Sequence, residues 1–132
     1  MIKSAEEFVR LRTSDKMDEY NIAGSEPAPI SVWLDIIARY PEMKRWVVLN
    51  RSVPLGILEI LATDADSSVR ATVANKRKLS LALFELLSRD VDEVVRQRIA
   101  YNKKVPPSIL RRLSMDASSF VREAAIKHLA GF

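Results

Sequence analysis

Aspartate and arginine recur at a fixed separation in the second half of the chain. Six residues form three such pairs: Asp64 with Arg70, Asp90 with Arg96, and Asp116 with Arg122. A carboxylate near a guanidinium suggests an acid–arginine catalytic set. The pairs, however, repeat every 26 residues, and residues at equal register in stacked repeats form ladders between units. An aspartate at a helix start also accepts backbone N–H groups that have no partner in the helix. We therefore expect a structural ladder and no catalytic residues.

Other chemistries lack the residues that they require. The segment Asp64-x-Asp66-x-Ser68 is similar to the start of a calcium loop, but Val69 stands where an EF-hand needs glycine. His128 is the single histidine and cysteine is absent, which excludes thiolate sites and His-pair metal sites. The three glycines form no phosphate-binding loop. We expect no cofactor, no metal and no enzyme activity.

The 26-residue repeat extends beyond the charged pairs. Each unit has an apolar first helix before its aspartate, with leucine or isoleucine at three- and four-residue steps, and a short second helix after it. Pro54 and Pro106 stand where first helices begin, as proline tolerates the first turn. The second helices carry apolar pairs at an i, i+4 step: Val69 with Val73, Val95 with Ile99, and Val121 with Ala125. Each unit must stack on its neighbours to bury two such stripes.

The pattern Asp, Val-Arg, Val/Ile-Ala and Asn resembles the leucine-rich repeat variant family and, more loosely, HEAT repeats. The segments that carry it best are Asp64–Asn75 and Asp90–Asn102, and the resemblance covers about residues 41–130. It implies a right-handed superhelix of helix pairs in which each second helix is either α or 3₁₀. The iron–sulfur cluster of one member of that family needs cysteines that this chain lacks.

These observations predict an all-α fold, an α-solenoid of about four 26-residue helix pairs behind an N-terminal helical cap. Residues 1–30 would form the cap and a Pro-rich loop at 24–29, with Ser4 and Glu7 as a capping box that opens a helix through Arg12. The array would occupy residues 31–132 within a single structural domain. Its units would be 31–50, 54–75, 80–102 and 106–130.

The residues that follow the second helices give two further expectations. Asn50, Asn75 and Asn102 would end those helices in the left-handed conformation that asparagine tolerates. Trp33 and Trp46 lie in apolar stripes of the first unit, where we expect them to be core.

Cations cluster in the loops that these asparagines begin. If the loops stack on one edge, they form a basic ridge of six residues: Arg51, Lys76, Arg77, Lys78, Lys103 and Lys104. Arg111 and Arg112 would extend it. The ridge is either a set of solvated loop charges or a docking edge for an anionic surface.

Charge and composition favour an anionic macromolecular partner. Of the net charge of +4, residues 1–40 carry −2 and residues 41–132 carry +6. We expect a cytoplasmic, non-enzymatic module that binds a protein with an acidic surface, as an adaptor or as an inhibitor such as an immunity protein that neutralises a toxin. The alternative is nucleic-acid binding through the ridge. We expect neither a membrane nor a small-molecule substrate as partner.

Overall fold

The chain is helical throughout. The computed structural model describes residues 1–131, which contain ten α-helices, one 3₁₀ helix and no strand. The all-α prediction is therefore confirmed for this part of the chain. None of these helices is long and apolar enough to cross a membrane.

The structure divides into two compact units. The first comprises Met1–Leu61 and the second begins at Ala62. The boundary falls inside the segment 54–75, between its two helices. Position 132, the last of the expected array, lies outside the described residues.

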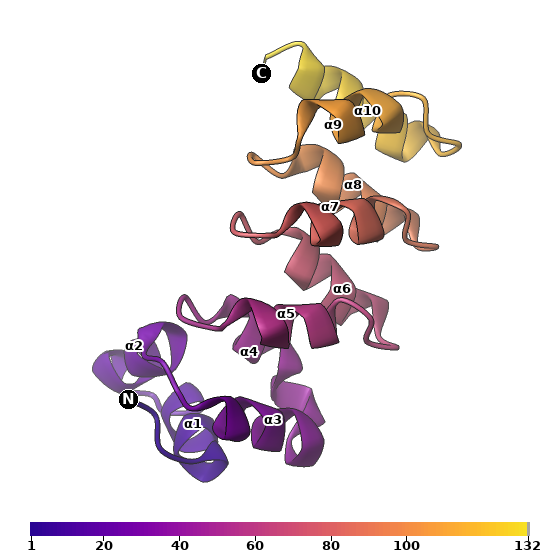
Figure 1. Ribbon diagram of the computed structural model, residues 1–132. Coiled ribbons are helices and arrows are strands. Elements are labelled where there is room, and N and C mark those ends of the chain that lie inside the picture. Colours follow the sequence, from indigo (N-terminus) through magenta and orange to yellow (C-terminus); the bar gives the residue numbers. More distant parts are fainter. Residues whose placement is uncertain (132) are drawn as a thin grey trace. The chain divides into compact units, whose positions relative to one another are not determined.

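Six short helices build the first unit (Figure 1). They are α1 (Ala5–Arg12), α2 (Met17–Ser25), α3 (Ile30–Arg39), η1 (Pro41–Met43), α4 (Lys44–Leu49) and α5 (Leu55–Leu61). Ser4 caps α1 as predicted, because its Oγ accepts a hydrogen bond from the Glu7 N–H at 3.0 Å. Helix α2 continues through Gly24 and Ser25, so the predicted loop starts two residues later than expected.

Aromatic packing fixes the core of the first unit. The rings of Phe8 in α1 and Trp33 in α3 meet edge to face with centroids 5.7 Å apart, and both side chains are fully buried. Trp33 is thus core, as predicted. Trp46 is wrongly predicted, because it is half-buried beside a pocket.

The second unit contains five helices with clear start signals. They are α6 (Ser67–Ala74), α7 (Leu81–Ser88), α8 (Glu93–Tyr101), α9 (Pro107–Leu113) and α10 (Ser119–Leu129). Asp66, Ser80 and Asp92 cap α6, α7 and α8 through side-chain oxygens that accept backbone N–H groups. The second helices α6, α8 and α10 are α-helical, which settles the choice between α and 3₁₀ that the sequence left open.

Two layers of helices bury the apolar stripes of this unit. Helix α8 packs against both α6 and α10, while α7 and α9 contact each other and lie on these three (Figure 1). All six apolar residues that the sequence placed on the second helices are buried. Leu86, which we expected on the buried face of α7, is 47% exposed, because Leu83 and Leu87 already define that face.

Candidate interaction surface

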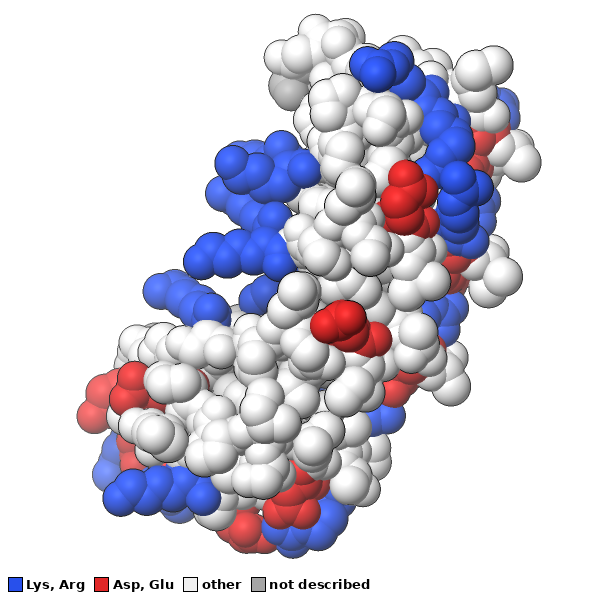
Figure 2. All heavy atoms as spheres, viewed as in Figure 1, with Lys and Arg blue, Asp and Glu red and all other residues white. Residues whose placement is uncertain are grey.

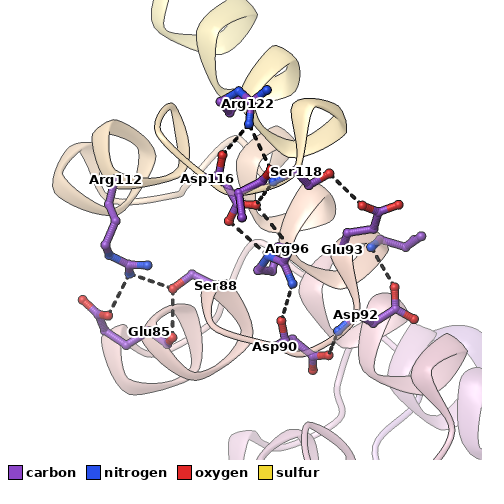
Figure 3. Close-up of polar contacts among 12 residues, drawn as sticks. Glu85, Ser88, Asp90, Asp92, Glu93, Arg96, Arg112, Asp116, Ser118 and Arg122 are labelled. Atoms are coloured by element: carbon purple, nitrogen blue, oxygen red, sulfur yellow. Dashed lines mark hydrogen bonds and ion pairs between the residues drawn. The ribbon is translucent and has the colours of Figure 1, made fainter.

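The arginines of the second unit join consecutive helix pairs (Figure 3). Arg96 on α8 donates to both carboxylate oxygens of Asp116, at 3.1 and 3.2 Å, and to the carbonyl of Asp90 at 2.7 Å. Arg70 on α6 repeats this pattern one unit earlier. It bonds the Asp90 carboxylate at 2.8 and 3.2 Å and the Asp64 carbonyl at 2.7 Å. Each guanidinium therefore spans from its own unit to the next.

The ladder ends at the last helix. Arg122 on α10 donates to the carbonyls of Asp116 and Ala117, at 2.8 and 3.0 Å. The aspartate carboxylates also order the loops between helices, since those of Asp90 and Asp116 accept N–H groups two residues further on. They are not helix caps, contrary to our expectation, because Asp66 and Asp92 take that position in α6 and α8.

These contacts are shielded from water. The side chains of Arg96 and Asp116 are 17% and 12% exposed, and those of Arg70 and Asp90 are 13% and 9% exposed. Hydrogen bonds to Asp90 raise the pKa of the Arg70 guanidinium. Bidentate pairs of this kind hold geometry as well as charge, so the arrangement fits a scaffold role better than a reactive one.

Asparagine side chains join successive loops in the same way. Nδ2 of the buried Asn102 donates to the carbonyl oxygens of Ala74 at 2.8 Å and Lys76 at 2.7 Å. In the first unit, Nδ2 of the buried Asn50 donates to the carbonyls of Ala23 and Glu26, at 2.8 and 3.0 Å. Both asparagines act as staples between loops.

The left-handed conformation that we expected for the asparagines is wrong. Asn50, Asn75 and Asn102 all have negative φ, and Gly131 alone among residues 1–131 has positive φ. The grouping of Asn75 with the other two is also one residue out of register. Positions 26 residues apart are Asn50, Lys76, Asn102 and His128.

His128 occupies the staple position in the last helix. Its Nδ1 lies 2.8 Å from the carbonyl oxygen of Ala100, which is equivalent to the Ala74 carbonyl that Asn102 bonds. A carbonyl only accepts, so Nδ1 carries the proton. The exact 26-residue register would have found this role in the sequence.

The Asn102 staple places two basic loops against each other. Arg77, Lys78, Lys103 and Lys104 are exposed there, and their side chains form no ion pair or hydrogen bond with residues 1–131. We call these four the exposed ridge cations. Figure 2 shows Lys and Arg projecting from this edge of the second unit, with no Asp or Glu among them on the visible face.

The other members of the predicted ridge are placed differently. Lys76 is half-buried, and burial lowers its pKa, as does the nearby charge of Lys78. Arg51 lies in the first unit, where its backbone N–H bonds the carbonyl of Gly24 at 2.9 Å. Arg112 pairs with Glu85 at 3.1 Å and bonds Ser88 at 2.9 Å (Figure 3), so its charge is compensated. Arg111 is exposed on α9.

Neither metal-binding clusters nor matches to known proteins were found. In the part of the chain that the structure describes, no three His, Asp or Glu side chains gather as metal ligands would. Comparisons with family models, curated proteins and solved structures gave no match.

Proposed function

We propose that the chain is a non-enzymatic helical repeat module of the α-solenoid type that binds an acidic protein surface. In this proposal the four helix pairs are repeats, the aspartate–arginine ladder is their internal scaffold, and the basic ridge is the docking edge. The module would act as an adaptor or as an inhibitor that covers the active surface of its target.

One observation carries the docking edge. The Asn102 staple fixes four exposed, uncompensated cations on adjacent loops. Surface cations usually occur with acidic neighbours nearby, whereas an uncompensated cluster raises the potential that steers an anionic partner into contact. The ladder supports the same proposal, because a surface held by bidentate contacts loses little entropy on binding.

A capture experiment tests this function. The ridge-reversed variant carries Arg77→Glu, Lys78→Glu, Lys103→Glu and Lys104→Glu. A matched control-reversed variant carries Lys3→Glu, Lys16→Glu, Arg45→Glu and Arg98→Glu, four exposed cations on other elements, so both variants have the same net charge. Lys76 is left intact because its side chain is half-buried.

We expect a protein from a nuclease-treated lysate of the native source to bind the wild type and the control-reversed variant, and the ridge-reversed variant to lose it. Both variants should melt close to the wild type, since an exposed charge contributes little to stability. Equal capture by all three proteins would contradict the docking edge. Recovery of nucleic acid alone from an untreated lysate would favour the alternative function.

A further inference from the structure

A pocket in the first unit contains two arginines and no acidic residue. It has a volume of about 420 Å³ and lies among α1, α2 and the loop that follows α4. Its lining includes Arg12, Tyr20, Asn21, Trp46 and Arg51. A volume of this size is typical of a small-molecule site.

Arg12 is held in the pocket by aromatic rings. Its guanidinium carbon lies 3.4 Å from the ring centroid of Trp46 and 4.7 Å from that of Tyr20. These contacts use the faces of the guanidinium, whereas its N–H donors point outward in its plane. Nε of Arg12 is buried without a hydrogen-bond partner, and no residue in 1–131 forms an ion pair with this side chain. The group is therefore orientated, half-buried and short of an acceptor.

Arg51 brings a second charge to the same pocket. The backbone of its loop is fixed by the bond from its own N–H to the Gly24 carbonyl and by the Asn50 staple. Its exposed side chain has no acidic partner among the described residues. Two guanidinium groups thus line one pocket without a counter-charge.

We propose that this pocket binds the phosphate monoester group of a small molecule. Such a group carries a charge of about −1.5 to −2 at pH 7 and three acceptor oxygens, which matches two guanidinium groups better than a single carboxylate does. Planar guanidinium forks bind phosphate oxygens in pairs. The pocket exceeds the size of phosphate alone, so the rest of the ester would lie against Tyr20, Asn21 and Leu49.

The test follows the fluorescence of Trp46 while the full chain is titrated with glycerol 3-phosphate, inorganic phosphate, acetate or succinate at constant ionic strength. We expect saturable binding of glycerol 3-phosphate with a Kd of about 1 mM or tighter. Trp46→Phe keeps a ring beside Arg12 and should abolish the signal, because the second tryptophan, Trp33, is buried in the core.

Two variants connect the signal to the arginines. Arg12→Lys keeps the charge but loses the planar fork, and Arg51→Gln removes an exposed charge; each should weaken binding about tenfold or more. Arg51→Gln keeps the test valid even if Arg12→Lys unfolds. Arg10→Lys is the matched control, because Arg10 lies on the same helix but pairs with Glu19, and it should bind as the wild type does.

Three results would overturn the proposal. The first is the absence of saturable binding of either phosphate probe, which would leave Arg12 as a purely structural contact. The second is tighter binding of acetate or succinate than of glycerol 3-phosphate. The third is unchanged affinity in Arg51→Gln.

Discussion

Asn102 donates a hydrogen bond from Nδ2 to the carbonyl oxygen of Lys76 across 2.7 Å, and this contact joins the two basic loops of the second unit. The same side chain accepts from the Lys104 N–H at 2.9 Å, so it orders its own loop as well. Asn102 is 5% exposed. A single buried amide therefore positions two loops that carry four exposed cations.

Asn102→Asp should destabilise the protein by about 3 kcal/mol, because it removes both amide donors and places a carboxylate against two carbonyl oxygens. The substituted side chain keeps the acceptor for Lys104, so the effect isolates the lost donors. Chemical denaturation measures it. Asn75→Asp is the control, as Asn75 is exposed, and it should change stability by less than about 0.5 kcal/mol. Similar effects of the two substitutions would refute the staple.

Arg96→Ala should cost about 1–3 kcal/mol, since it breaks the bidentate pair with Asp116 and the bond to the Asp90 carbonyl. Arg98→Ala, on the same helix but exposed, should be close to neutral. The free energy of unfolding of each variant gives the comparison. A neutral Arg96→Ala would mean that the ladder arginines do not hold the units together.

Arg39 makes the first unit sensitive to acid. Its guanidinium bonds Asp35 at 2.6 and 2.7 Å and also bonds Glu6, and these hydrogen bonds hold the pKa of each carboxyl below its ordinary value, 3.8 for Asp35 and 4.5 for Glu6. A folded-state pKa below the unfolded one stabilises the protein above the unfolded pKa, and this contribution is lost as the pH falls through the folded pKa.

Arg39→Gln should therefore raise both pKa values toward 4.5 and 3.8. NMR titration of the two carboxyl groups measures the change directly. The stability difference from the wild type should be greatest near neutral pH, shrink in acid and shrink with added salt, because all three side chains are exposed. Unchanged carboxyl pKa values in the variant would contradict this account, and Arg45→Gln provides the control.

Nucleic acid should bind weakly. The exposed ridge cations have Tyr101 as their one aromatic neighbour in sequence, which gives single strands little to stack on. We expect no sub-micromolar binding of generic duplex or single-stranded DNA at physiological salt. Sub-micromolar binding that the ridge-reversed variant abolishes, with a log–log salt slope of about −0.9 per phosphate contact, would reverse the choice of partner.

The helices and the buried stripes were predictable because their signals are local. Ser4, Ser80 and Pro106 mark helix starts, and the apolar pairs of the second helices follow the helical period. The ladder aspartates and arginines were visible as a 26-residue register, but the span of each arginine to the following unit depends on how helix pairs pack. Grouping by residue type chose Asn75, whereas strict register selects Lys76 and His128.

The phosphate pocket was not predictable from the repeat. Its residues come from α1, α2 and the end of α4, and α2 lies outside the 26-residue pattern. Trp46 appeared to be core because it stands in an apolar stripe. Its half-buried position depends on Arg12, 34 positions earlier in the chain, and no local pattern connects the two.

The affinity of the captured protein partner for three forms of the chain tests the central proposal most directly. Calorimetry at physiological salt should give similar Kd values for the wild type and the control-reversed variant, and a Kd about 100-fold weaker for the ridge-reversed variant, because long-range attraction and contact are lost at one edge. Equal Kd values for the two reversed variants would show that net charge, and not the basic ridge, governs binding, and would contradict the account.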